Sequence, residues 1–159
     1  MKSAVYPGTF DPIHNGHIDL IERASMMFDR LYVVIAINSK KNNLFSEDER
    51  LDMVRGSLAH IENVDVVFHS SLLVNFAKEK GASALIRGLR TVSDFEYEMQ
   101  IAMMNQKMSG ISTIFLLPDL KYSYLNSSII KEISKYNQNI EDFVPKEVAI
   151  RLEKKFTKD

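Results

Sequence analysis

The sequence predicts a single α/β domain, residues 1–159, built on a doubly wound sheet of five parallel strands with a C-terminal helical extension. Apolar runs of strand length alternate with segments of helical periodicity along the whole chain, which is typical of such a sheet. The run 31–37 is apolar without interruption and rich in β-branched residues, so it predicts a strand buried on both faces. A chain of 159 residues, 45% apolar and 26% charged, suits one ordinary globular domain.

The first elements follow from short patterns. The apolar run 4–6 predicts a strand that ends at Pro7-Gly8, and helical spacing predicts a helix from His17 to Phe28. The strand 31–37 is followed by a polar loop. The pattern Ser46-x-x-Glu49 is a capping box, which predicts a helix continuing to about His60.

The remaining elements follow from the same reasoning. Gly81 and Gly110 are placed to end helices, and Ser93-x-x-Glu96 reads as a second capping box. Pro145 suits the first position of a terminal helix. The predicted strands are 64–68, 82–86 and 111–117, and the predicted helices are 72–80, 93–108, 126–136 and 145–156.

Composition excludes several classes of protein. With 20 basic and 21 acidic residues the net charge is -1, which argues against a nucleic-acid partner. The absence of cysteine excludes a disulfide, a thiolate metal site and a cysteine nucleophile. There is no signal-peptide pattern, and no apolar run approaches the roughly 20 residues that span a bilayer. We therefore expect a cytoplasmic protein without a membrane partner.

Polar clusters follow every predicted strand. Because the carboxyl ends of parallel strands meet at one edge of the sheet, where ligands bind, these clusters predict one shared site. The clusters are 9–17, 40–41, 70–73, 87–90 and 122–128.

The first cluster contains Gly-Thr-Phe-Asp-Pro followed by the pattern His-x-Gly-His, with His14 and His17 three residues apart. A strand, a tight turn and a helix N-terminus together form a ready phosphate site. Gly16 would leave room for a phosphate, and Thr9 offers a hydroxyl and an N–H. The two histidines could instead be a loop and cap pair, or metal ligands, but no nearby cysteine or glutamate completes a familiar zinc set.

The other clusters offer further phosphate ligands. Arg87 and Arg90 present forked donors that bind phosphate, although surface arginines are often only solvated. Lys41 would add a point charge. The stretch 122–128 ends at a helix start, where it could cap the helix or hold β- and γ-phosphates. Glu98 would by default belong to a solvated helix face, and the methionines near 99–104 to a core or subunit contact.

Together these motifs carry the signature of the His-x-Gly-His nucleotidyltransferase superfamily, and the chain resembles the bacterial pantetheine-phosphate adenylyltransferase family. The resemblance rests on residues 6–17, Lys41, Ile-Arg-Gly-Leu-Arg at 86–90 and Asp-Phe-Glu-Tyr-Glu-Met at 94–99. It implies a Rossmann-like nucleotidyltransferase fold and transfer of AMP from ATP to 4'-phosphopantetheine, which yields 3'-dephospho-CoA and pyrophosphate. It also implies Mg²⁺ held mainly by ATP phosphates, feedback inhibition by coenzyme A in the same pocket, and a homohexamer made of two trimers.

The resemblance also implies residue roles. His17 would stabilise the transition state and rank above His14, and Thr9 would contact both substrates. Asn126 stands where the family often has a small hydroxyl residue, so binding is expected with altered detail. The phosphopantetheine ligands would be Thr9, Lys41, Leu73 and Arg87, with Lys41 and Arg87 also catalytic. The ATP ligands would be Thr9, Phe10, His17, Gly88, Leu89, Arg90, Glu98, Tyr122, Ser123, Tyr124, Leu125, Asn126, Ser127 and Ser128.

The implied chemistry needs no general base, because the attacking phosphate oxygen is already ionised and can displace pyrophosphate in line without a covalent enzyme intermediate. One alternative is another small nucleotidyltransferase, either a cytidylyltransferase or a mononucleotide adenylyltransferase. The Arg-Thr-x-Gly-Ile-Ser-Thr-Thr signature of cytidylyltransferases is absent, which disfavours the first. A non-catalytic nucleotide-binding regulator is the other alternative, and the intact His17, Lys41 and Arg87 argue against it.

Overall fold

The computed structural model describes residues 1–36 and 42–157 and contains a five-stranded sheet in the order β3-β2-β1-β4-β5. All four strand pairs are parallel, so the predicted fold class is confirmed. The chain runs outward from β1 to β3 on one side and then returns to build β4 and β5 on the other. The strands are β1 Ser3–Gly8, β2 Arg30–Ala36, β3 Val64–His69, β4 Ala84–Gly88 and β5 Ser112–Leu116.

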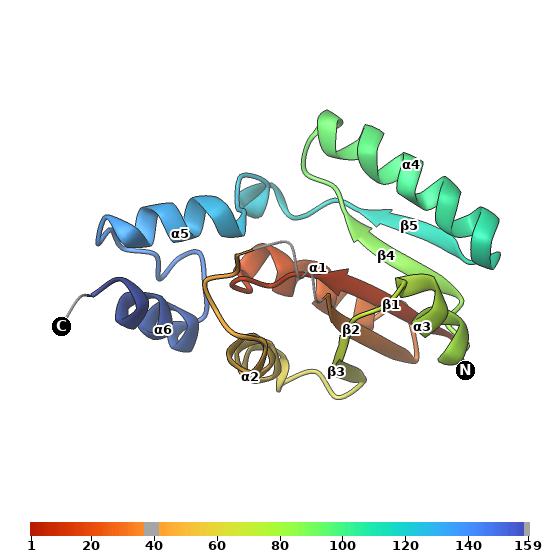
Figure 1. Cartoon of the computed structure of the whole chain (residues 1–159), viewed down its shortest axis with the longest axis horizontal. Helices are drawn as coiled ribbons and strands as arrows, with labels where there is room; N and C mark the ends of the chain where they lie inside the picture. Colours follow the sequence, from red (N-terminus) through yellow and green to blue (C-terminus); the bar gives the residue numbers. More distant parts are fainter. Residues whose placement is uncertain (37–41, 158–159) are drawn as a thin grey trace.

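Helices cover the sheet, and two of them extend the molecule at the C-terminal end. In Figure 1, α5 and α6 lie side by side at the end opposite to the N-terminus, as the predicted helical extension requires. No helix in the described part of the chain is long and apolar enough to cross a bilayer. The helices are α1 Asn15–Ser25, α2 Glu47–Leu58, α3 Leu73–Glu79, α4 Val92–Ser109, α5 Ser127–Lys135 and α6 Lys146–Phe156, with a 3₁₀ turn at Leu120–Tyr122.

The two faces of the sheet are buried in two separate apolar clusters. Val33 and Ile35 of β2 belong to the larger cluster, whereas Val34 between them belongs to the smaller one. The larger cluster includes side chains of α1, α2, α5 and α6, and the smaller one those of α3. Successive side chains of a strand point to opposite faces, so burial of both faces explains the uninterrupted apolar run.

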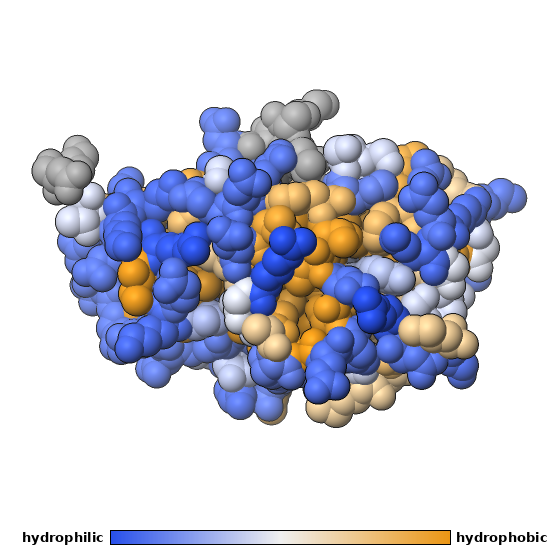
Figure 2. All heavy atoms as spheres, turned by 90° about the horizontal axis from the view of Figure 1, so that it is seen from below, coloured by the Kyte–Doolittle hydropathy of each residue, from blue (hydrophilic) through white to orange (hydrophobic). Residues whose placement is uncertain are grey.

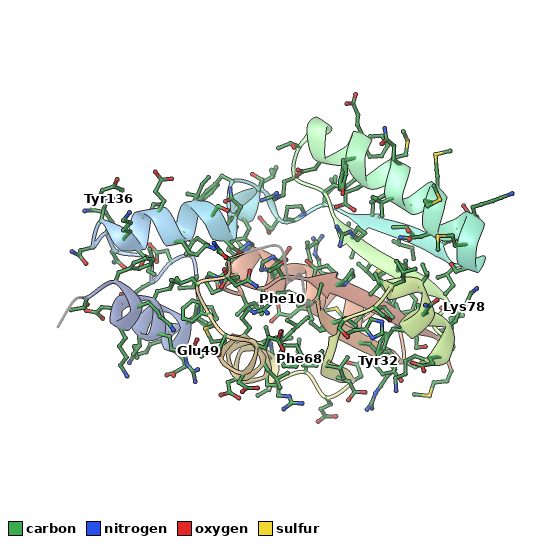
Figure 3. The ribbon with its side chains drawn as sticks, viewed as in Figure 1. Phe10, Tyr32, Glu49, Phe68, Lys78 and Tyr136 are labelled. Atoms are coloured by element: carbon green, nitrogen blue, oxygen red, sulfur yellow. The ribbon has the colours of Figure 1, made fainter. Side chains whose placement is uncertain are left out.

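The edge strand β3 pairs only with β2 among the strands described. The face on which α2 and β3 lie, shown in Figure 2, has apolar atoms in its middle and hydrophilic side chains around them. Figure 3 labels Phe10 near the centre of the molecule, on the segment that leads from β1 to α1. Phe10 is 1% exposed and belongs to the larger apolar cluster, so this segment lies close to the core.

Several predicted helix ends are confirmed. The Glu49 N–H donates to Ser46 Oγ at 3.2 Å, and the Ser46 N–H donates to Glu49 Oε2 at 2.8 Å, which completes the predicted capping box. Gly110 follows α4 in the left-handed conformation with φ of 76°, where glycine has no steric cost.

Other predicted ends were wrong. The N-cap of α4 is Thr91, whose hydroxyl accepts from the Asp94 N–H at 3.2 Å, so the second capping box does not start at Ser93. Thr91 lies two residues earlier and is also among the preferred N-cap residues. Helix α1 spans Asn15–Ser25 instead of 17–28, and it begins earlier because the imidazole of His14 caps it.

The last predicted helix start was also displaced. Pro145 is the N-cap of α6, and its φ of -57° and ψ of 149° are those of an extended residue before a helix.

The strand predicted at 31–37 is β2 Arg30–Ala36, and residue 37 lies outside the described residues.

Two glycines give a stability prediction of opposite sign. Gly56 sits exposed in α2, and a methyl group added there would meet only open space, so Gly56→Ala should raise the free energy of unfolding by about 0.5–1 kcal/mol. A methyl group added to Gly110 would also meet open space, but the backbone there is left-handed. Gly110→Ala should therefore lower the free energy of unfolding by about 1 kcal/mol. Urea unfolding of both variants tests this, and shifts of the same sign would contradict it.

Candidate functional site

A cavity of about 480 Å³ opens at the carboxyl ends of β1 and β4. The strand order reverses between these two strands, which is where open α/β sheets bind ligands. Its volume lies within the range of small-molecule sites. The sequence-predicted residues that line it are Thr9, Phe10, His14, His17, Arg87, Gly88, Arg90, Glu98, Tyr122, Leu125, Asn126 and Ser127.

Some predicted residues do not line the cavity. Leu73, in the first turn of α3, packs against the smaller apolar cluster, and Leu89 is buried, with its N–H donating to the Leu116 carbonyl at 2.9 Å. Tyr124 is exposed and packs edge-on against Phe143. Ser123 and Ser128 also lie outside the lining. Lys41, like Lys40, lies outside the described residues.

His14 and His17 cap each other. The His17 N–H donates to His14 Nδ1 and the His14 N–H donates to His17 Nδ1, both at 3.3 Å. The two rings stack with 3.6 Å between their centroids. Because a backbone N–H can only donate, each Nδ1 must be unprotonated. Each neutral imidazole therefore carries its proton on Nε2 and keeps that atom as a donor.

Both imidazoles are held neutral. Burial, with a smaller contribution from Arg90, lowers the pKa of His14 to about 3. Burial also lowers the pKa of His17 well below its ordinary value, assisted by His14 and Arg90. The pair is therefore suited to donate hydrogen bonds to an anion rather than to act as a cation. Within residues 1–36 and 42–157, no group of three potential ligands could hold a metal ion.

Gly16 lies close against the ring of His14. A methyl group built on Gly16 would lie 3.1 Å from the His14 ring, which is tighter than ordinary van der Waals contact. The predicted reason for Gly16 was free access for phosphate. The structure adds the packing of the His14 ring as a second reason.

Arg87 forms a two-pronged ion pair with Glu98 across the cavity wall. The Arg87 Nε donates to Glu98 Oε2 at 2.6 Å, and Nη2 donates to Oε1. Burial disfavours the charged guanidinium, but Glu98 outweighs this and raises the pKa of Arg87 above its usual value. The two hydrogen bonds to Glu98 orient the arginine before any ligand arrives.

Arg90 joins two walls of the cavity. Its Nε donates to Asp94 Oδ2 and its Nη1 to the Leu125 carbonyl, both at 3.3 Å. It thereby connects the start of α4 with the segment that leads into α5. Asp94 also lines the cavity, although sequence analysis did not single it out.

The start of α5 forms the remaining polar wall. Asn126 Oδ1 accepts from the Ile129 N–H at 2.9 Å, so Asn126 alone caps the helix. The Ser127 hydroxyl donates to the Pro12 carbonyl at 2.8 Å and ties α5 to the turn after β1. The first N–H groups of a helix have no acceptor within it, so this end can receive an anion.

Comparison with known proteins agrees with this geometry. The profile of the Cytidylyltransferase-like family matches residues 5–133. The chain is 50% identical over 157 residues, covering 98% of this chain and 96% of the relative, to the phosphopantetheine adenylyltransferase of Desulforudis audaxviator (strain MP104C).

Two solved structures share the fold. One, from Vibrio parahaemolyticus, was assigned as a nicotinate-nucleotide adenylyltransferase and matches with a TM-score of 0.71, 16% identity, and coverage of 96% of this chain and 91% of that one. The other, a lipopolysaccharide core biosynthesis protein from Thermoplasma volcanium GSS1, matches with a TM-score of 0.55, 23% identity, and coverage of 75% and 97%.

The family match over most of the chain makes this protein a cytidylyltransferase-like nucleotidyltransferase. The two solved structures support the fold alone. Within that class, identity over nearly the whole length shows that the chain belongs to the phosphopantetheine adenylyltransferase family.

The lowered pKa of His14 predicts a specific pH dependence of stability. Between the native pKa of about 3 and the unfolded value of about 6.5, only the unfolded chain binds a proton at His14. The free energy of unfolding should therefore fall by about 1.4 kcal/mol per pH unit from this residue as pH drops below about 6.

His14→Asn tests this, because asparagine can still cap α1 but does not titrate. Urea unfolding between about pH 8 and pH 5 should give the variant a shallower loss of stability on the acid side. Equal slopes for the two proteins would mean that His14 titrates normally in the native state.

Proposed function

We propose that this chain transfers AMP from ATP to 4'-phosphopantetheine, giving 3'-dephospho-CoA and pyrophosphate in coenzyme A biosynthesis. One observation carries the proposal: His17, Arg87 and the start of α5 share one cavity, in a chain 50% identical to a phosphopantetheine adenylyltransferase. Two phosphate-bearing molecules must meet end to end in such a reaction, and this cavity has phosphate donors on several walls.

The two substrates divide the cavity between them. ATP would take the histidine pair and the start of α5 for its phosphates, together with Gly88, Arg90 and Leu125, which also line the cavity. Thr9 and Phe10 line the same cavity from the turn after β1. The phosphate of 4'-phosphopantetheine would be held by Arg87 and Lys41. The role of Leu73 toward the pantetheine arm, and the roles of Leu89, Ser123, Tyr124 and Ser128 toward ATP, remain predictions from the sequence.

The chemistry is a direct displacement. An ionised phosphate oxygen of phosphopantetheine forms a bond to the α-phosphorus of ATP as the bond to the β-phosphate oxygen breaks, and pyrophosphate leaves. No proton must be removed from the nucleophile. His17 Nε2–H is a fixed, neutral donor that stabilises the added negative charge on the α-phosphate, because its Nδ1 already accepts from His14.

Mg²⁺ is proposed to enter with ATP. The described residues contain no array of three metal-binding side chains, and the Glu98 carboxylate is engaged by Arg87. These features fit an ion whose ligands are mainly phosphate oxygens and water, as Mg²⁺ prefers. When bound, Mg²⁺ would neutralise charge on the phosphates during transfer.

Assembly and regulation form part of the same proposal. Helix α4 exposes Tyr97 at 64%, Met103 at 65% and Met104 at 59%, which supports contact with another copy in the proposed hexamer of two trimers. Coenzyme A contains the phosphopantetheine group, so it would compete for the same cavity. Light scattering tests the hexamer, and a cytoplasmic location remains a prediction from the sequence.

A substrate comparison tests the reaction. Pyrophosphate release should require ATP and 4'-phosphopantetheine together. CTP with glycerol phosphate, or ATP with nicotinate mononucleotide, should give no more than background. Release with one of those pairs would favour another nucleotidyltransferase, and nucleotide binding without release from any pair would favour the non-catalytic regulator.

Substitution of His17 tests the mechanism. His17→Asn keeps a polar side chain but removes the donor at the Nε2 position, so kcat should fall roughly 10²–10³-fold with smaller changes in KM. His17→Gln is the matched variant, because its longer amide can reach that position and should retain more activity. A change confined to KM in both variants would contradict transition-state stabilisation.

A further inference from the structure

Arg50 of α2 is buried, and no carboxylate of the described residues pairs with it. Its side chain is only 2% exposed, and none of the ion pairs formed by the described residues includes it. Its Nε has no hydrogen-bond partner there either. An apolar side chain of similar volume would avoid the cost of burying this charge. Stability alone therefore gives no reason for an arginine at this position.

The contact that Arg50 does make is with the turn after β1. Its Nη1 donates to the Thr9 carbonyl at 2.8 Å. Thr9 and Phe10 line the cavity, whereas Arg50 does not, so the guanidinium lies behind the cavity wall. The Thr9 carbonyl must therefore point away from the cavity, toward the interior.

The orientation of the Thr9 carbonyl determines the direction in which the Phe10 N–H points. The Thr9–Phe10 peptide is trans, and in a trans peptide the C=O and N–H groups point in opposite directions. With the Thr9 carbonyl held inward by Arg50, the Phe10 N–H is directed to the cavity side. Within residues 1–36 and 42–157, no acceptor takes a hydrogen bond from it.

The turn needs such support. Phe10 has a φ of 49°, a left-handed conformation that is uncommon for a bulky residue and persists only where its surroundings impose it. The Asp11 carboxylate accepts from the Leu44 and Phe45 N–H groups, at 3.0 and 2.9 Å, and from Lys131 at 2.8 Å. These contacts anchor the residue after Phe10, whereas among residues 1–36 and 42–157 the side chain that holds the peptide before it is that of Arg50.

We propose that Arg50 is a positioning residue that aims the Phe10 N–H into the cavity as a donor for an anionic phosphate chain. The proposal depends on the proposed function only in taking this anion to be the phosphate chain of a nucleotide. Arg50 acts from behind the turn and touches no substrate. Its charge, unpaired by any described carboxylate, also makes that side of the cavity more favourable for an anion.

Inorganic tripolyphosphate is a suitable probe, because its binding requires no transfer reaction. In the ¹⁵N-labelled full chain, addition of tripolyphosphate should shift the amide resonance of Phe10. Arg50→Met should weaken tripolyphosphate binding about tenfold, the equivalent of one hydrogen bond, and should abolish the Phe10 shift. A wild-type Phe10 resonance that does not respond would overturn the proposal, as would wild-type affinity and a retained shift in Arg50→Met.

Arg55→Met is the matched control. Arg55 lies on the same helix and also donates to a backbone carbonyl, that of Val66 at 3.4 Å, but this acceptor belongs to β3 rather than to the turn. The tripolyphosphate affinity and the Phe10 shift of the Arg55→Met variant should equal those of the wild type. Equal losses in both variants would assign the effect to α2 as a whole and overturn a specific role of Arg50.

If Arg50→Met does not fold, Arg50→Lys takes its place. Lysine keeps the charge but lacks the planar fork, so tripolyphosphate affinity should fall about threefold, and full affinity would overturn the proposal. The outcomes also distinguish the proposed transfer reaction from the proposed role of Arg50. A chain that shows the Phe10 response but transfers no AMP refutes the proposed reaction alone, and an active chain without the response refutes the role of Arg50 alone.

Discussion

The mutual capping of His14 and His17 is the contact on which the site depends. One pair of hydrogen bonds starts α1, stacks two rings 3.6 Å apart and assigns both protons to Nε2. It also favours a glycine between the two histidines, because a Cβ at Gly16 would press on the His14 ring. The pattern His-x-Gly-His is therefore first a way to begin a helix, and this local structure produces two neutral donors facing one cavity.

The fold was largely predictable because its signals are local and consistent. The uninterrupted apolar run of β2 reflects burial on both faces, and Ser46-x-x-Glu49 marks the start of α2 by chemistry that needs no tertiary context. The errors fall where two residues compete for one role. Thr91 and Ser93 are both residue types that can cap α4. Which of them does so depends on the direction in which the chain leaves β4. An imidazole is an unusual cap, so the start of α1 was placed too late.

The site was predictable as a set of clusters but not as a network. The motifs identify His17, Arg87 and Asn126, and parallel topology brings them to one edge. The pairing of Arg87 with Glu98 joins a strand end to the middle of a helix, and no sequence spacing specifies it. Arg50 was missed, although a signal existed. It occupies the same buried stripe of α2 as Met53, Val54 and Leu58, where a charged side chain calls for a reason.

The Arg87–Glu98 pair has a consequence for the energetics of ligand entry. A solvated guanidinium must lose ordered water before it can bind a phosphate. That rearrangement adds to the free-energy barrier of a reaction in which negative charge shifts between phosphates. Here the Glu98 carboxylate already holds the Arg87 guanidinium in place, with 2.6 Å between Nε and Oε2. The charged and polar groups around Arg87 are therefore already oriented. Little rearrangement of these groups is required when a negatively charged substrate binds.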